Sequence, residues 1–197
     1  RDTTWFGIIW CRIWERNGFY KMEYRNELKF ELSDYELIRI KHRLLPLMRT
    51  DLHQGPDGYL IRSLYFDDLY NSCAAEKENG ICLREKYRIR QYDNHTDTVR
   101  LEKKARRGNM SRKTMQSLDA QDYKALISGD SDRLHAILSQ NEDSLLGEFA
   151  CKILYRKFSP KCVVEYERFA FVENTGNVRV TFDRNIAGSL QTESFFD

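Results

Sequence analysis

The sequence predicts an α+β domain in which antiparallel strands close into a barrel, or β-tunnel, with a polar cationic lumen and helices packed on the outside. Three observations lead to this fold class. In the segment 82–92 a cation occupies every second position, which gives a strand one charged face and one apolar face. The segment 98–106 repeats this alternation. The chain also contains helical segments that can cover the apolar faces, so that the charged faces turn inward.

Composition shows that this positive charge is local. The 197 residues are 41% hydrophobic, enough for a substantial core, and the formal net charge of +2 excludes a globally basic protein. Residues 81–113 nevertheless hold eleven cations against four anions, an excess of seven. Five dispersed cysteines without a CxxC pair and four scattered histidines predict reduced thiols, a cytoplasmic location and no zinc site.

The stretch 1–21 differs in composition from the rest of the chain. It holds all three tryptophans and precedes a methionine, Met22, that resembles a natural start. We interpret it as an atypical N-terminal extension, either an artefact or an amphipathic arm. Residues 22–197 are expected to form the tunnel domain.

The first elements of that domain are predicted as a strand, a helix and a second strand. In 27–32 apolar and charged residues alternate. The residues expected to face a core are Leu28, Phe30 and Leu32. A capping box of Ser33 and Glu36 begins a helix that extends to about residue 48. A turn then leads to a strand over 59–68 that ends at two aspartates.

The segments 82–92 and 98–106 are predicted to pair with each other. The linker between them is short and turn-like, which favours an antiparallel hairpin. The even-numbered residues share the charged face, and they are Arg84, Lys86, Arg88, Arg90, Arg100, Glu102, Lys104 and Arg106. Arg112 and Lys113 begin a further short strand.

The second half of the chain is predicted as helices followed by two strands. Residues 119–157 have a helical pattern, with Asp119 and Ser131 as N-caps. Strands over 161–172 and 177–183 follow, joined by a turn. The aromatic residues of the predicted strands are expected in the core, and they include Tyr65, Phe66, Phe169 and Phe171.

The density of cations indicates an anionic ligand. Cations on one face repel each other unless an anion lies among them, and a closed lumen would gather them around such an anion. Arginine offers a planar fork that matches phosphate oxygens, and lysine offers a compact charge. A chain of phosphate groups is therefore the expected ligand, with a merely solvated face as the alternative.

Six motifs in order carry a resemblance to a known family. They are "ELKFEL", "IRSLYFDD", "REKYRIRQY", "RLEKKA", "VEYERFAF" and "VRVTFD", between Tyr24 and Asp183. In this order they resemble the vacuolar transporter chaperone (VTC) domain, the polyphosphate polymerase branch of the CYTH, or triphosphate tunnel metalloenzyme, superfamily. The resemblance implies an antiparallel β-tunnel wrapped by helices.

Carried over residue by residue, the resemblance implies a set of cations that contact phosphates. The candidate catalytic residues are Lys29, Arg88, Arg90 and Lys104. Further candidate phosphate-binding residues are Arg62, Lys113, Arg168 and Arg179. The alternation along 82–92 adds Arg84 and Lys86, which continue the same charged face.

The candidate metal ligands depart from the superfamily pattern. That pattern begins with Glu-x-Glu-x-Lys, whereas this chain has Arg25, Glu27 and Lys29 at the equivalent positions. The missing first acid favours the polymerase branch over a triphosphatase. The family's late metal-binding glutamate has no match after "VRVTFD", so either the domain is truncated or other residues hold the metal. The candidates are Glu27 and Glu102, which could instead hold neighbouring Lys and Arg in place.

The resemblance implies transfer of the terminal phosphoryl group of ATP to a polyphosphate chain, with Mg²⁺ or Mn²⁺ as cofactor. ATP, polyphosphate and pyrophosphate are then the expected ligands, and a membrane partner subunit is compatible with this reading. Two other classes of function stay open. One is a non-catalytic sensor or scaffold that binds polyphosphate or phosphate, and the other is nucleic-acid binding by a basic sheet.

Overall fold

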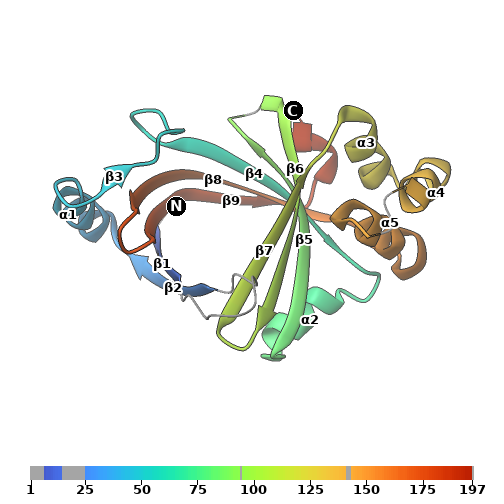
Figure 1. The fold of residues 1–197 in the computed structure, drawn as a ribbon, viewed down its shortest axis with the longest axis horizontal. Coiled ribbons are helices and arrows are strands. Elements are labelled where there is room, and N and C mark those ends of the chain that lie inside the picture. Colours follow the sequence, from blue (N-terminus) through green and yellow to red (C-terminus); the bar gives the residue numbers. More distant parts are fainter. Residues whose placement is uncertain (1–6, 15–24, 94, 141–142, 197) are drawn as a thin grey trace. The chain divides into compact units, whose positions relative to one another are not determined.

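The structure is a computed structural model that describes residues 7–14, 25–93, 95–140 and 143–196 (Figure 1). Its helices and antiparallel strand pairs confirm the α+β class. The chain divides into two compact units. The first comprises Arg1–Ile61, Asn109–Arg112 and Glu165–Ala187, and the second comprises Arg62–Gly108, Lys113–Val164 and Gly188–Asp197. Four strands contribute residues to both units, namely β4 (Tyr59–Asp67), β7 (Met110–Ser117), β8 (Ser159–Glu173) and β9 (Val178–Ser189).

The sheet of the first unit includes a strand from the stretch 1–21. This strand, β1 (Gly7–Trp14), pairs antiparallel with β2 (Arg25–Leu32) and with β9, while β3 (Arg49–Thr50) pairs with β8. The hydrogen-bonded order is β3-β8-β9-β1-β2-β7. Residues 1–6 and 15–21 lie outside the described residues, and the division of the chain after residue 21 stays a prediction.

The helix of the first unit, α1 (Asp34–Leu44), begins as predicted. The side chain of Ser33 accepts a hydrogen bond from the backbone N–H of Glu36, and the Glu36 carboxylate accepts one from the backbone N–H of Ser33 at 2.9 Å. The capping box is therefore confirmed. The apolar side of the helix packs on the β8 and β9 core residues Phe171, Val180 and Phe182 through Leu37, Ile40 and Leu44.

The core of the first unit corrects part of the prediction for 27–32. Leu28 and Phe30 are 51% and 52% exposed, and only Leu32 packs against the core. The reason is length. An eleven-residue helix spans about 16 Å, whereas an eight-residue strand spans about 26 Å, so α1 covers only one end of β2.

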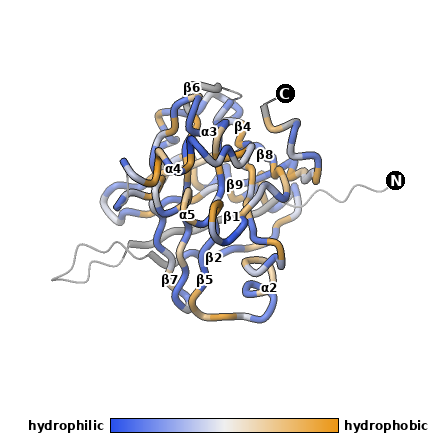
Figure 2. The backbone as a smooth tube through the Cα atoms, turned by 90° about the vertical axis from the view of Figure 1, so that its right-hand side faces the viewer, coloured by the Kyte–Doolittle hydropathy of each residue, from blue (hydrophilic) through white to orange (hydrophobic). Residues whose placement is uncertain are grey.

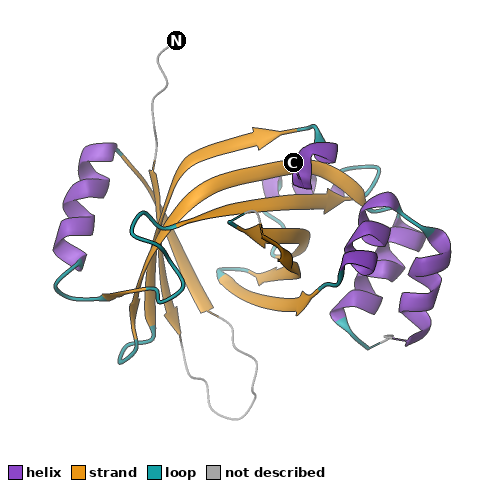
Figure 3. Ribbon diagram, turned by 90° about the horizontal axis from the view of Figure 1, so that it is seen from above, coloured by secondary structure: helices purple, strands orange, loops and turns teal. Residues whose placement is uncertain are grey.

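The second unit contains the predicted hairpin. β5 (Leu83–Tyr92) pairs antiparallel with β6 (His95–Arg107), and β4 and β7 lie on either side of the pair. The helices of this unit are α2 (Ser72–Glu78), α3 (Ala120–Ser128), α4 (Ser131–Gln140) and α5 (Leu145–Arg156), followed by a 3₁₀ turn, η1 (Thr192–Phe196). Figure 3 shows α3, α4 and α5 gathered into one group.

The apolar face of the hairpin is buried against these helices, as predicted. Tyr87, Ile89 and Leu101 share a core with Phe149 of α5 and with residues of α4. The rings of Tyr87 and Phe149 are stacked at 5.0 Å between centroids. Burial of one face fixes the strand register and leaves the even-numbered residues on the other face.

The ends of the helices confirm one predicted cap and correct another. Asp119 caps α3 by accepting hydrogen bonds from the backbone N–H groups of residues 121 and 122. Ser131 lies inside α4, and the adjacent Asp130 accepts from the first amides of that helix instead.

Asp67 and Asp68 end β4 as predicted. They also accept from five backbone amides between 68 and 74, which organises α2, a helix that the sequence reading missed.

Hydrophilic and hydrophobic residues are mixed along the helices and strands of each unit (Figure 2). This mixture is typical of elements that bury one face only. Within the part of the chain that the structure describes, none of the helices combines the length and the apolar character needed to cross a bilayer.

Candidate functional site

The charged face of the β5–β6 hairpin carries four cross-strand pairs, and three of them join like charges. The pairs are Arg84 with Arg106, Lys86 with Lys104, Arg88 with Glu102, and Arg90 with Arg100. Like charges directly opposite each other destabilise an antiparallel pair. The buried apolar face holds the hairpin together despite this repulsion, so the charged face is suited to an anionic ligand.

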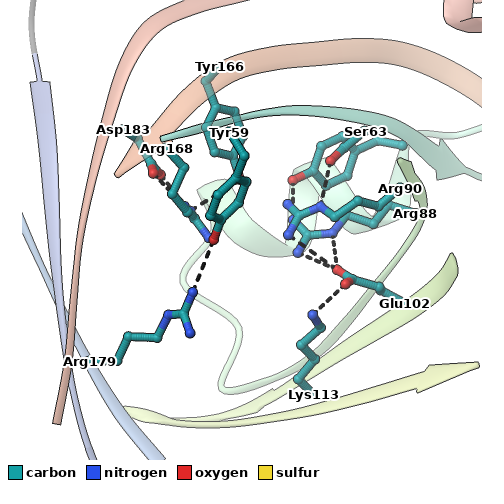
Figure 4. A network of polar contacts seen from close by, with 11 residues as sticks. Tyr59, Ser63, Arg88, Arg90, Glu102, Lys113, Tyr166, Arg168, Arg179 and Asp183 are labelled. Carbon is teal, nitrogen blue, oxygen red and sulfur yellow. Dashed lines mark hydrogen bonds and ion pairs between the residues drawn. The ribbon is translucent and has the colours of Figure 1, made fainter. Parts of the chain in front are cut away.

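The one pair of opposite charges is the centre of a cluster in the second unit (Figure 4). Arg88 donates from Nε and Nη2 to one oxygen of Glu102, at 2.8 and 2.6 Å, and Nη1 of Arg90 lies 3.6 Å from the same oxygen. Lys113 of β7 forms an ion pair with the other oxygen. Glu102 is only 1% exposed. We call these four residues the Glu102 cluster.

Two hydroxyl groups of β4 complete the surroundings of the cluster. Ser63 accepts a hydrogen bond from Nε of Arg90 at 3.0 Å, and the Tyr65 hydroxyl accepts one from Nη1 of Arg88 at 2.8 Å. Sequence reasoning missed Ser63 and placed Tyr65 in the core. The signal was the alternation of β4, in which Leu64 and Phe66 are buried in the apolar core while Ser63 and Tyr65 face the other side.

The electrostatics of the cluster keep Glu102 ionised. Burial alone would raise the pKa of Glu102, but the positive charges of Arg88, Arg90 and Lys113 hold that pKa well below its ordinary value. Burial is also the main cause that lowers the pKa of Lys113, to about 8, and the two arginines add to the decrease while Glu102 opposes it. Burial would raise the pKa of Tyr65, but Arg88 and Arg90 lower it.

The first unit has a second set of paired arginines. Arg168 is buried and donates from Nε and Nη2 to the two oxygens of Asp183, at 2.6 and 2.7 Å. Arg179 donates to the Tyr59 hydroxyl at 3.0 Å and forms an ion pair with Asp51. Both arginines were predicted to bind phosphate, and both are held by carboxylates of their own unit.

The remaining predicted residues are Lys29, Arg62, Arg84, Lys86 and Lys104. Lys29 is an exposed residue of β2 in the first unit. Arg62 lies on the opposite face of β4 from Ser63, because successive strand residues face opposite sides, and it donates to the backbone oxygen of Phe195 at 3.3 Å. Arg84 donates to the backbone oxygen of Ile81 at 2.8 Å. Lys86 and Lys104 stay on the charged face, opposite each other.

Glu102, one of the two predicted metal ligands, does not fit a divalent cation as it is arranged. Both oxygens of Glu102 already face cations, so a metal ion there would meet three positive charges. Glu27, the other predicted ligand, is a half-buried residue of β2 in the first unit, and its role as a ligand stays a prediction. Among the described residues, no group of three or more His, Cys, Asp or Glu side chains could hold a metal ion.

Comparisons with known proteins give a match to a family profile and likenesses to solved structures. The profile of the family described as the VTC domain matches residues 24–194. A solved structure from Bacillus halodurans, described as a candidate adenylate cyclase, is 15% identical and covers 83% of this chain and 79% of its own, with a TM-score of 0.42. A search of curated proteins gives no match.

Proposed function

Because the chain belongs to the VTC domain family, we propose that it binds chains of phosphate groups, such as polyphosphate or the triphosphate of ATP, on the charged face of the β5–β6 hairpin. Family membership supports a tunnel domain for phosphate-containing ligands. The observation that carries the proposal for this chain is the run of like-charged pairs, which a repeating anion would bridge.

The spacing of the pairs suits a chain better than a single phosphate. Successive pairs are about 7 Å apart along the strand, and the four pairs extend over about 20 Å. One orthophosphate can reach one pair, whereas a chain contacts several pairs at once and gains from multivalency. Arginine forks and lysine ammonium groups then replace the hydration of the phosphate oxygens.

Binding is expected to strengthen with the length of the phosphate chain. Isothermal titration of the protein with orthophosphate, tripolyphosphate and a longer polyphosphate should give successively lower dissociation constants, and raising the salt concentration should weaken all three. A single-stranded oligonucleotide serves as the control, since a general basic sheet would bind it comparably. Equal affinity for orthophosphate and tripolyphosphate would contradict the proposal.

Binding is also expected to weaken above pH 8. The pKa of Lys113 is about 8, so this lysine loses the charge that attracts phosphate as the pH rises from 7 to 9. Between pH 8 and its ordinary value of 10.5 the unfolded chain holds more protons at this site, so this group makes the unliganded protein more stable as the pH rises. Affinity and stability should therefore move in opposite directions.

Two variants assign this pH dependence. Lys113→Arg, which stays charged, should flatten the decrease in tripolyphosphate affinity between pH 7 and 9. Tyr65→Phe removes a hydroxyl beside Arg88 whose pKa the two arginines also lower, and it should leave the decrease in place. If the affinity of Lys113→Arg still decreases between pH 7 and 9, a group other than Lys113 causes the pH dependence.

The finer part of the proposal is catalysis. The protein would transfer the terminal phosphoryl group of bound ATP to the end of a polyphosphate chain. Such a reaction needs positioning and charge neutralisation more than a nucleophilic side chain. Arg88, Arg90 and Lys104 share one face of the hairpin, where they would orient the phosphates. A divalent cation, Mg²⁺ or Mn²⁺, would add charge neutralisation when it is bound to the phosphates of the nucleotide.

Incubation of the protein with ATP and MnCl₂ tests this finer proposal. We expect long polyphosphate on a gel and matching release of ADP, and neither product from an Arg88→Ala, Arg90→Ala variant. Binding of tripolyphosphate without any product would favour the sensor or scaffold alternative. The lack of a clustered acid site among the described residues is the observation that supports that alternative.

A further inference from the structure

We propose that Glu102 is an internal counter-anion of the hairpin site rather than a metal ligand. It holds the three surrounding cations in place when no phosphate is bound, and it limits the affinity for the phosphate that binds there. The inference deepens the proposed function and rests on it.

The geometry shows a carboxylate whose two oxygens are both used. One oxygen faces Arg88 at 2.6 Å and Arg90 at 3.6 Å, and the other faces Lys113. The four residues of the cluster come from three strands, because Arg88 and Arg90 lie on β5, Glu102 on β6 and Lys113 on β7. One anion therefore ties three neighbouring strands together on their charged face.

The charges of the cluster explain why an anion is needed at this position. Arg90 is 2% exposed and Arg88 is mostly buried. Without Glu102 these guanidinium groups and the Lys113 ammonium group would repel each other with little water to screen them. A bound phosphate could neutralise the same three cations. The Glu102 carboxylate therefore plays the part of a ligand's negative charge when no ligand is bound.

The carboxylate should also lower the affinity for phosphate. Three cations and one anion leave two net positive charges, and removal of the anion would leave three. A bound phosphate oxygen near Arg88 would be repelled by the carboxylate that the same arginine contacts. Glu102 thus lowers the affinity for phosphate, but it keeps the unliganded site preorganised and allows the ligand to be released.

The variant Glu102→Gln tests both roles, because glutamine has nearly the same shape but no charge. Glu85→Gln is the matched control. Glu85 lies on the opposite face of β5, pairs with Lys103 at 2.8 Å, and its replacement changes the net charge by the same amount. The measurements are the unfolding temperature, tripolyphosphate affinity in the presence of EDTA, and Mn²⁺ binding by electron paramagnetic resonance.

We expect Glu102→Gln to unfold at a lower temperature than the control when no ligand is present. Tripolyphosphate should then raise its unfolding temperature more than that of the wild type, with an affinity about tenfold higher. Mn²⁺ binding should be the same in Glu102→Gln and in the wild type. An unchanged or weaker tripolyphosphate affinity in this variant, or loss of Mn²⁺ binding that the wild type shows, would overturn the inference.

A double variant covers the case in which Glu102→Gln does not fold. Glu102→Gln with Lys113→Gln removes one anion and one cation together, so the cluster keeps its net charge. It should be more stable than the single variant and should lack the gain in affinity, and a double variant that is no more stable would overturn the inference. If the wild type itself fails to bind tripolyphosphate, the proposed function fails. If the wild type binds and Glu102→Gln binds no better, only the inference fails.

Discussion

The Arg88→Ala, Arg90→Ala double variant is expected to lose tripolyphosphate affinity by about 10²–10⁴-fold. Each arginine can make charge-assisted hydrogen bonds to phosphate oxygens, worth about 1.5–3 kcal/mol apiece. The two residues lie on the same face of β5, two positions apart along the strand. Isothermal titration measures the loss, and an affinity within threefold of the wild type would refute the assignment of the hairpin as the binding face.

Loss of binding in this variant must be separated from loss of stability. Removal of both arginines leaves the buried Glu102 with Lys113 alone, so the free energy of unfolding should fall by about 3–5 kcal/mol. Two companion variants make the distinction. Arg88→Lys, Arg90→Lys keeps the charges and loses the planar forks, and it should bind with intermediate affinity.

Lys86→Ala, Lys104→Ala is the second companion variant. These lysines face each other across the hairpin, whereas Arg88 faces a buried carboxylate. We expect weaker binding of the longer polyphosphate at a smaller cost in stability, because removing the two lysines also removes a like-charged cross-strand pair. Urea unfolding followed by circular dichroism would check the second half of this expectation.

Gly58→Ala is expected to reduce the free energy of unfolding by about 2–5 kcal/mol. Gly58 has a φ of +102°, and a Cβ added there would lie 2.2 Å from the backbone oxygen of Arg168 on β8. The positive φ costs about 1–2 kcal/mol for a residue with a side chain, and the clash with backbone adds about 1–3 kcal/mol. Glycine therefore permits the close approach of the 54–58 turn to the strand that carries Arg168.

Gly80→Ala provides the control for backbone strain without a clash. Gly80 has a φ of +67° and no atom within 4 Å of an added Cβ, so its replacement should cost only the backbone strain of about 1–2 kcal/mol. Urea unfolding of both variants gives the comparison. Equal losses in the two variants would show that the approach of Gly58 to β8 does not matter for stability.

Much of the second unit could be predicted because alternation is a local property. The two faces of 82–92 and 98–106, their antiparallel pairing and the burial of Tyr87 and Ile89 all follow from residue order and the period of a strand. The same rule was wrong for Leu28 and Phe30. Alternation says which residues share a face, but the length and position of a helix decide whether that face is covered.

The candidate site was predicted as a set of cations, and the structure adds the hydroxyls and carboxylates that these cations contact. Ser63, Tyr65, Asp51 and Asp183 were not predicted as partners of the arginines, because hydroxyls and single carboxylates on strands give no distinctive pattern. Glu102 was predicted either as a metal ligand or as a partner of neighbouring cations. Its three ion pairs favour the second interpretation.

The sequence by itself determined that two neighbouring strands carry cations on one face and a core on the other, since side-chain direction in a strand depends only on position along it. Only the tertiary structure decided that Glu102 gathers Arg88, Arg90 and Lys113. That meeting depends on the register in which β5 and β7 pair on either side of β6, and hydrogen bonding between the strands sets this register, not the alternation along any one of them.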